Sequence, residues 1–349
     1  MTTPDQLAAL RARYPNGQRE VPADPDLRRA VEFAFAGTGR RKLPYSGVST
    51  FLGAPYRADP DDLSGLDVAL LGVPMDLGVT NRSGSRLGPR AVRAIERIGP
   101  YNHALRTTPL AELRVADIGD VPFRSRYSLP DSHDDIRGFF TRVQQSGVIP
   151  LAVGGDHSIT YPILQALGAG QPLGLVHIDA HCDTAGEQEG SRFHHGGPFR
   201  QAVLDGVLDP QRTIQIGIRG AAEMLYEFSY ASGMTVIHAE EIDALGIPGV
   251  IARARAVIGD APFYVSFDVD GVDPAFTPGT GTPEVGGLTP REVQAILRGL
   301  RGLPIAGGDV VEVAPQYDAT TVTAQVGAQM LFEMLSLVAL RPHWERGPH

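Results

Sequence analysis

Short apolar runs alternate with longer stretches of helical spacing from residue 66 onward. Several runs, such as LDVALLGVP at 66–74, are apolar at nearly every position rather than at every second one. This pattern is typical of strands in a parallel sheet that helices cover on both faces. The predicted strands are 66–74, 113–119, 148–155, 173–179, 212–218, 234–239, 263–270 and 305–313.

The stretches between these runs repeat apolar residues at the spacing of an α-helix. The helix at Thr289 has the clearest start, because Pro290 follows this N-cap residue and Glu292 can close a capping box. No internal repeat or low-complexity linker interrupts the alternation, so we predict a single α/β domain over residues 51–349. The predicted helices are 86–98, 132–146, 158–168, 221–232, 247–259, 289–301 and 321–340.

Residues 1–50 differ from the rest, since they are rich in Arg, Asp and Pro and contain one short amphipathic candidate at 26–36. We expect an arm that wraps over the domain or over a neighbouring subunit. The alternative is a partly disordered tail.

Composition narrows the class of protein. Of the 349 residues, 42% are hydrophobic and 20% are charged, as in soluble globular proteins. The formal net charge of -9 disfavours nucleic-acid binding and is compatible with a cationic substrate. Cys182 is the sole cysteine, which excludes an internal disulfide and favours a reducing compartment.

No apolar run approaches the roughly 20 residues of a membrane span, and the first residues lack a secretory signal pattern. We therefore expect a cytoplasmic protein without a membrane partner.

The stretch LVHIDAHCDT at 175–184 carries ionisable side chains where an apolar run ends. Side chains two apart in an extended chain lie on the same side. Asp268 and Asp270 end another predicted strand, and GGDHS at 154–158 follows a third. Ligands of such sheets bind beyond the carboxyl ends of the strands, so these segments can converge on one edge. The alternating side chains of the first stretch are His177, Asp179, His181 and Asp183.

Four carboxylates in one small region repel one another, and burying an unpaired charge costs several kcal/mol. Either some are protonated or cations lie between them. Two divalent ions would balance the charge; carboxylate and imidazole ligands favour manganese, with nickel, zinc or iron as alternatives. Two ions about 3.5–4 Å apart can share a bridging hydroxide, a nucleophile near neutral pH. One Asp-x-Asp or Asp-x-His at a strand end is often only a turn or a cap, but two clusters together with GGDHS favour a metal site.

Two neighbours of these residues have simpler interpretations. His177 lies inside the strand, so we expect a hydrogen-bonded core histidine that supports the site rather than a metal ligand. Cys182 should point to the opposite side and act as a small apolar filler.

Six motifs resemble signatures of the ureohydrolase family, which holds arginases, agmatinases and other guanidino-compound hydrolases. The resemblance spans about residues 66–340, and the segment around Asp268 is its most specific part. The motifs are RSGSRLGPRAVR at 82–93, GGDHS at 154–158, DAHCDT at 179–184, HGGPF at 195–199, SFDVDGVDPAFTPGTGTPEVGGL at 266–288 and VVEVAPQYD at 310–318.

This resemblance implies a three-layer α/β/α fold with an eight-stranded parallel sheet and a binuclear manganese site, with nickel as the alternative metal. One ion would be bound by His157 and Asp183 alone, and the other by His181 and Asp270 alone. Asp179 and Asp268 would bridge both ions.

The resemblance further implies that His195 is the proton shuttle to the leaving amine and that Glu312 pairs with the guanidinium of the substrate. A carboxylate can hold this planar cation by a forked pair of hydrogen bonds, and a histidine is suited to protonating an amine near neutral pH. The products would be urea and an amine. The other reading of Glu312 is an ion-pair partner at a strand end, and His194 is expected to be a loop residue that can contact substrate.

Within the family the motifs resemble the agmatinase-type branch, with two departures: Gly197 where threonine is frequent and Ser83 where proline is frequent. Loops 77–86, 184–195 and 219–224 should recognise the substrate tail. Agmatine is the first expected substrate, and a guanidino-acid hydrolase or guanidinase is the alternative. Candidate tail contacts are His194, Arg192 and Asn81. Arg192 could hold a carboxylate, whereas Glu187 or Glu189 could hold an amine. The alternative is that Arg192, Glu187 and Glu189 all face solvent.

Two readings lie outside this class. One is a zinc deacetylase-like hydrolase, which would need only one ion. The other is a non-catalytic subunit of a mixed oligomer, which would bind ligands or subunits without catalysing a reaction. The acidic surface, the arm and the resemblance suggest a homo-trimer or homo-hexamer.

Overall fold

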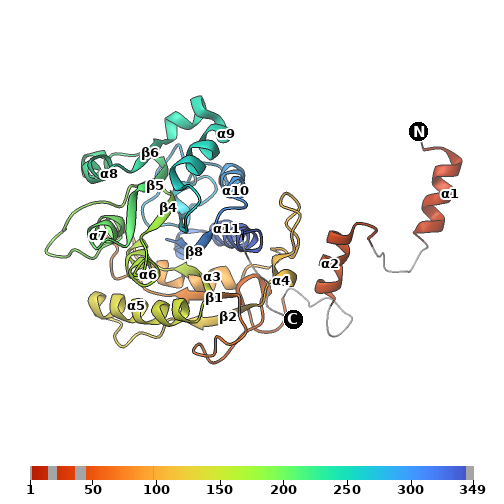
Figure 1. Cartoon of the computed structure of the whole chain (residues 1–349), viewed down its shortest axis with the longest axis horizontal. Helices are drawn as coiled ribbons and strands as arrows, with labels where there is room; N and C mark the ends of the chain where they lie inside the picture. Colours follow the sequence, from red (N-terminus) through yellow and green to blue (C-terminus); the bar gives the residue numbers. More distant parts are fainter. Residues whose placement is uncertain (1, 15–21, 36–44, 97, 343–349) are drawn as a thin grey trace.

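The computed structural model describes residues 2–14, 22–35, 45–96 and 98–342 (Figure 1). Eight parallel strands form a single sheet in the order β2-β1-β3-β8-β7-β4-β5-β6. Each strand overlaps one of the predicted runs, so the strand predictions and the parallel α/β class are confirmed. The strands are β1 (Val68–Val73), β2 (Val115–Asp120), β3 (Ile149–Gly154), β4 (Leu173–Ile178), β5 (Leu208–Ile218), β6 (Thr235–His238), β7 (Phe263–Asp268) and β8 (Ile305–Val311).

Every predicted helical stretch contains a helix, although several bounds differ. The stretch 86–98 holds only a short helix, and α9 begins eight residues early because a kink at Gly246 joins two helical pieces. Helices α1, α4 and α7 were not predicted: α4 and α7 are short, and α1 buries none of its residues, so no core-facing pattern marks it. The helices are α1 (Pro4–Arg13), α2 (Pro25–Ala34), α3 (Gly88–Arg93), α4 (Pro109–Glu112), α5 (Leu129–Gln145), α6 (Thr160–Leu167), α7 (Pro198–Leu204), α8 (Glu227–Ser232), α9 (Ala239–Ile258), α10 (Pro290–Gly299) and α11 (Val322–Ala339).

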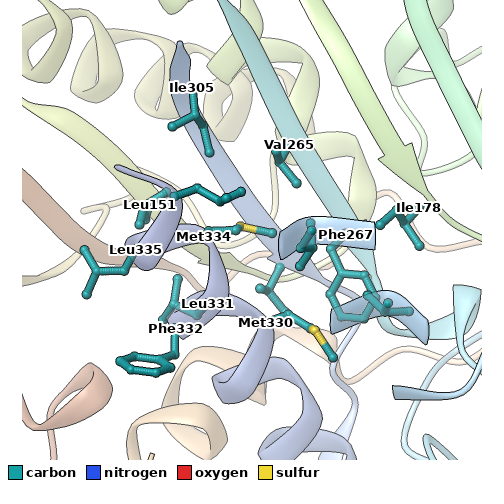
Figure 2. Packing of buried hydrophobic residues seen from close by; sticks show 14 of the residues in the cluster. Leu151, Ile178, Val265, Phe267, Ile305, Met330, Leu331, Phe332, Met334 and Leu335 are labelled. Atoms are coloured by element: carbon teal, nitrogen blue, oxygen red, sulfur yellow. The ribbon is translucent and has the colours of Figure 1, made fainter. Parts of the chain in front are cut away.

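Helices cover the sheet on both faces, which makes three layers. Leu70 of β1 belongs to the core shared with α9, α10 and α11, whereas Leu71 belongs to the core shared with α5, α6 and α7. Figure 2 shows the first of these cores, where Leu331 and Met334 of α11 pack near Leu151 of β3. Burying one such side chain contributes about 1.5–3 kcal/mol. Strands that are apolar at every position follow from this double burial.

Helix α11 is long and apolar enough to cross a membrane by length and composition alone. Most of it is buried inside the protein, however, and it forms the centre of the core in Figure 2. The hydrophobicity of α11 is therefore that of a core helix.

The arm contacts the domain through α2. Arg29 pairs with Glu112 at 3.1 Å, and Arg106 pairs with Asp24 and Asp26 at 3.0 and 2.9 Å. Helix α1 buries none of its residues and lies away from the sheet in Figure 1.

Candidate metal centre

The sheet order brings the polar segments of the sequence together. Strands β3, β8, β7 and β4 are neighbours, and all are parallel, so their carboxyl ends share one edge. The histidine of GGDHS follows β3, the DAHCDT segment follows β4, Asp268 ends β7, and Glu312 follows β8. The predicted convergence on one edge is what the structure shows.

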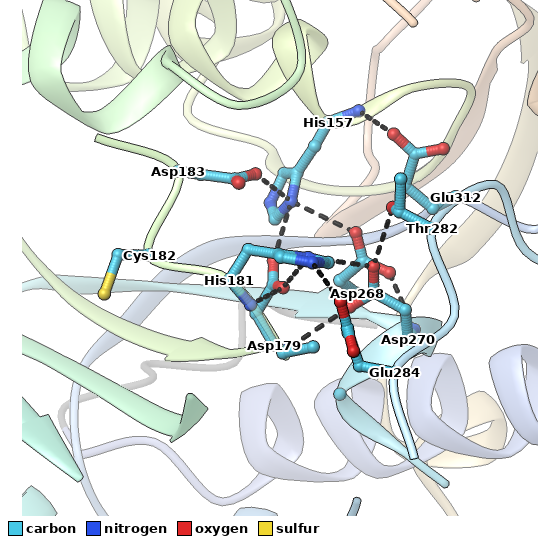
Figure 3. A network of polar contacts seen from close by, with 12 residues as sticks. His157, Asp179, His181, Cys182, Asp183, Asp268, Asp270, Thr282, Glu284 and Glu312 are labelled. Carbon is cyan, nitrogen blue, oxygen red and sulfur yellow. Dashed lines mark hydrogen bonds and ion pairs between the residues drawn. The ribbon is translucent and has the colours of Figure 1, made fainter. Parts of the chain in front are cut away.

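His157 lies at the centre of this edge (Figure 3). Its Nδ1 is 3.0 Å from Asp183 Oδ2, 3.1 Å from Asp179 Oδ2 and 3.3 Å from Asp268 Oδ2. The side chain is buried, and Nδ1 has no hydrogen-bond partner among the described residues. Three carboxylate oxygens and an imidazole nitrogen therefore face one small volume.

The tautomer of His157 follows from its other nitrogen. Nε2 is 2.8 Å from the hydroxyl of Ser266, and that hydroxyl donates to Asp309 at 2.7 Å. Because the hydroxyl proton is used for Asp309, Ser266 accepts a hydrogen bond from Nε2–H, which leaves a lone pair on Nδ1. A lone pair aimed at carboxylate oxygens is repulsive unless a proton or a cation lies between them.

A second group of donors adjoins the first. Nδ1 of His181 lies 3.2 Å from Asp270 Oδ2 and 3.4 Å from Asp179 Oδ1. Asp179 thus turns one oxygen toward each histidine, whereas Asp268 directs Oδ2 toward His157 and accepts the amide N–H of Asp270 on Oδ1. The six predicted ligands are therefore together, in two adjoining groups.

The carboxylates of the centre repel one another and favour protonation of the histidines between them. Although burial opposes the charged form of His157, its contacts with Asp179, Asp183 and Asp268 raise its pKa well above the usual range. Burial raises the pKa of Asp268 well above its usual range, and the charges of Asp270 and Asp179 act in the same direction. Burial and the charge of Asp179 also raise the pKa of Asp270 to about 6. Carboxylates with imidazole nitrogens are the donors that divalent transition metals take, and such ions would remove the repulsion. The residues present therefore fit divalent metal ions.

The surrounding structure holds the backbone of Asp183 and of Glu312 in an unusual conformation. Asp183 and Glu312 have φ of 52° and 63°, in the left-handed region that non-glycine residues rarely adopt. Such a conformation costs about 1–3 kcal/mol and persists only where the surroundings enforce it. Close packing beside Glu312 contributes to this. The N–H of Glu312 donates to the carbonyl of Gly155, and a Cβ on Gly155 would lie 1.6 Å from the carbonyl oxygen of Met75.

His177 and Cys182 lie as the sequence indicated. Nε2 of His177 contacts Asp179 Oδ2 at 2.8 Å, and its Nδ1 accepts from the amide of Gln215 at 3.0 Å. Both ring nitrogens are therefore used, although His177 is close enough to the other donors to be grouped with them. Cys182 is buried and points away from the cluster in Figure 3.

His195 and Glu312 form a pair beside the cluster. Nδ1 of His195 is 2.9 Å from Glu312 Oε1, which also accepts the backbone N–H of His157 at 2.9 Å. Burial opposes protonation of His195, but its hydrogen bond to Glu312 raises its pKa to about 9. Oε2 of Glu312 is buried without a partner among the described residues. The carboxylate therefore has one free oxygen, whereas the forked contact expected from the sequence would use two.

A cavity of about 220 Å³ opens onto this site. Of the candidate tail contacts, none of Arg192, His194 and Asn81 lines it: Arg192 stacks on Phe193, His194 contacts the carbonyl of Gly186, and Asn81 is exposed. Among the lining residues that the sequence did not single out are Thr80, Gln188, Tyr226 and Thr282. The lining residues are Thr80, His181, Asp183, Ala185, Gln188, His195, Gly196, Ala222, Leu225, Tyr226, Asp268, Asp270 and Thr282.

Some supporting residues could have been found in the sequence. Ser266 and Asp309 are polar positions inside otherwise apolar strand patterns, and both are fully buried. A polar residue in a strand that is covered on both faces needs a buried partner, so each was a detectable signal. Thr80 lies in a loop and gave no such signal.

The fold and the site together define a class: a three-layer α/β protein with a buried His/Asp cluster that could hold metal ions at the carboxyl edge of its parallel sheet. Comparison with known families agrees with this class. The chain belongs to the Arginase family, which matches residues 66–336. The resemblance to ureohydrolases and the arginase-like fold are confirmed.

Several characterised proteins and solved structures are similar to this chain. Guanidinopropionase of Pseudomonas aeruginosa is 48% identical over 299 residues, which are 84% of this chain and 93% of that protein. Mitochondrial agmatinase of Gallus gallus is 46% identical over 315 residues, 89% of this chain and 92% of that protein. The solved structure of proclavaminate amidino hydrolase from Streptomyces clavuligerus has a TM-score of 0.80 at 36% identity, over 85% of this chain and 99% of that one.

Proposed function

We propose that this chain hydrolyses a guanidino compound to urea and an amine, with agmatine as the preferred substrate. The observation that carries the proposal is the position of the His195–Glu312 pair beside the His/Asp cluster. A guanidinium needs a strong nucleophile, an anion that holds it and an acid for the leaving amine. The site offers a group for each need.

The cluster would hold two divalent ions, manganese first and nickel as the alternative. When bound, such ions supply a hydroxide nucleophile near neutral pH. The ion held by His157 and Asp183 and the ion held by His181 and Asp270 would share Asp179 and Asp268. This assignment uses every carboxylate of the cluster and the lone pair of His157 Nδ1.

The remaining steps belong to side chains of this chain. Glu312 Oε2 is the free oxygen that can accept a guanidinium N–H. When the C–N bond to the amine breaks, the departing nitrogen takes a proton, and His195 can give it because it lines the cavity and its pKa lies near 9. Glu312 then stabilises the charged form of His195 between turnovers.

The lining of the cavity disfavours a carboxylate tail. No lysine or arginine is among the described lining residues. The guanidinium of Arg219 donates hydrogen bonds to backbone carbonyls, such as those of Asp270 and Glu284. A carboxylate tail would lose water without gaining a cation. The second candidate is a guanidino-acid hydrolase, which the identity of 48% to guanidinopropionase favours.

Urea release tests the proposal. The purified chain, loaded separately with manganese and with nickel, is given agmatine, 4-guanidinobutyrate, 3-guanidinopropionate and guanidine. Agmatine and 4-guanidinobutyrate share the guanidinobutyl chain and differ in the charge of the end group, so their ratio isolates tail recognition. We expect the highest kcat/KM with agmatine; faster turnover of an acid selects the second candidate, and no urea from any compound with full metal occupancy contradicts the reaction.

The assembly and the arm complete the proposal. We place the protein in the cytoplasm as a homo-trimer or homo-hexamer of one ureohydrolase domain, residues 51–349, with residues 1–50 as an arm. The exposed apolar side chains Leu7, Leu10 and Tyr14 at α1 support a contact with a second copy. Light scattering that finds a monomer would remove this part of the proposal.

A further inference from the structure

Two loops meet at His195. The backbone N–H of His195 donates to the carbonyl of Gly78 at 2.9 Å, so the loop before α7 rests on the segment after β1. Asp156 holds the same segment, because its Oδ2 accepts the N–H of Gly78 at 2.8 Å. The position of the His195 ring therefore depends on residues that follow β1.

Thr80 contacts the ring itself. Its hydroxyl is 2.7 Å from Nε2 of His195, and its backbone N–H donates to the same nitrogen at 3.2 Å. Glu312 occupies the other ring nitrogen at 2.9 Å. The imidazole is thus fixed at both ends, with its plane and its Nε2 direction determined by Thr80 and Glu312 together.

The two groups of Thr80 are not equivalent. A backbone N–H can only donate, so it serves the neutral ring and opposes the protonated one. A hydroxyl can donate to the neutral ring and accept from the protonated ring. Of these two groups, only the hydroxyl therefore suits His195 both before and after it transfers its proton.

We propose that Thr80 is a positioning residue for the reaction: its hydroxyl holds Nε2 of His195 in the orientation that protonates the leaving amine. This inference rests on the proposed function. Thr80 lines the cavity beside His195, so its hydroxyl adjoins the space that a substrate would occupy. The group acts through His195 and needs no bond to the substrate.

The test compares Thr80→Val, which keeps the shape but removes the hydroxyl, with Thr80→Ser, which keeps the hydroxyl. We expect Thr80→Val to lower kcat for agmatine, or for the best substrate of the panel, about tenfold with KM changed less than about twofold, since misplacing a catalytic group mainly slows the chemical step. Thr80→Ser should stay within about threefold of the wild type. Thr141→Val is the matched control, because that hydroxyl makes an exposed hydrogen bond to the carbonyl of Arg137 within helix α5 and does not line the cavity.

A double-mutant cycle with His195→Asn separates positioning from other roles. If Thr80 acts through His195, adding Thr80→Val to His195→Asn should lower kcat less than about twofold. An equal loss in both backgrounds, or a rise in KM with unchanged kcat, would mean that Thr80 contacts substrate or supports the fold, and the inference would be wrong. A wild type that releases no urea removes the proposed function and this inference with it, whereas an active wild type with an additive cycle removes the inference alone. Equal metal content in all variants verifies that the ions are not the cause.

Discussion

Buried carboxylates in two regions of this protein are balanced in different ways. Asp117 of β2 is fully buried, and Arg93 of α3 binds it through two guanidinium nitrogens at 2.8 and 3.0 Å. The backbone amides of Phe51 and Gly119 donate to the same carboxylate. Both oxygens of Asp117 therefore have partners within the chain.

The carboxylates of the metal centre have no arginine or lysine partner among the described residues. Three of them turn an oxygen toward Nδ1 of His157, which lacks a hydrogen-bond partner there. The Asp117 cluster is complete as folded and stabilises the fold. In the candidate metal centre, bound cations would balance the carboxylates, whereas without cations their mutual repulsion disfavours the fold. The predictions below separate these two uses of buried charge.

Asp268→Asn should produce the largest effect. The amide keeps the shape but is a weak metal ligand, so urea release should fall about 1,000-fold or more, the equivalent of several kcal/mol of transition-state stabilisation. Without metal the variant should be about as stable as the wild type, because the raised pKa of Asp268 favours the uncharged acid, which the amide resembles. Metal analysis, urea assay and thermal unfolding with and without manganese measure all three quantities. Unchanged metal content with full activity would contradict the assignment.

Arg93→Ala should act in the opposite sense, on stability and not on chemistry. It leaves Asp117 buried without its cation, which costs about 3–5 kcal/mol of unfolding free energy. Urea denaturation measures this loss, and the folded fraction should keep its kcat. Arg142→Ala is the control, since its pair with Asp61 is largely exposed and contributes about 0.2–1 kcal/mol. Equal losses of unfolding free energy in the two variants would show that the buried Arg93–Asp117 pair contributes no more to stability than an exposed pair.

Ser266→Ala tests the support of the metal centre and should have the smallest effect. Losing the hydroxyl that orients Nε2 of His157 should lower metal affinity or activity about 10–100-fold, as for other residues that hold a metal ligand. A manganese titration followed by urea release gives both values. Ser266→Thr keeps a hydroxyl and should lose less if it fits. An affinity equal to that of the wild type in Ser266→Ala would mean that packing alone orients His157.

Much of the fold was predictable because each strand is covered on both faces. Double burial makes runs such as Val68–Val73 apolar throughout, and such runs stand out in a sequence. The capping box at Thr289 was also predicted from the sequence, and the structure contains it. The bounds of short helices were less predictable, and the seven-residue α7 was missed because it spans only about two turns.

The candidate site divides in the same way. His181 and Asp183 are recognisable because they interrupt an apolar run at every second position. The contact of Thr80 with His195 was not predictable, because the two residues are 115 positions apart and both lie in loops. Likewise, the hydrogen bond between Glu312 and His195 uses an oxygen that the sequence had assigned to substrate.

By itself the sequence determined which side chains end which strands, since hydrophobic period and local turn chemistry act over a few residues. It could not determine the order of strands in the sheet. Only the tertiary structure decided that β3, β8, β7 and β4 are neighbours, and thereby that carboxylates over 80 positions apart share one small volume. The reason is physical: strand order is set by how all the helices and strands pack at once, and no local pattern encodes that sum.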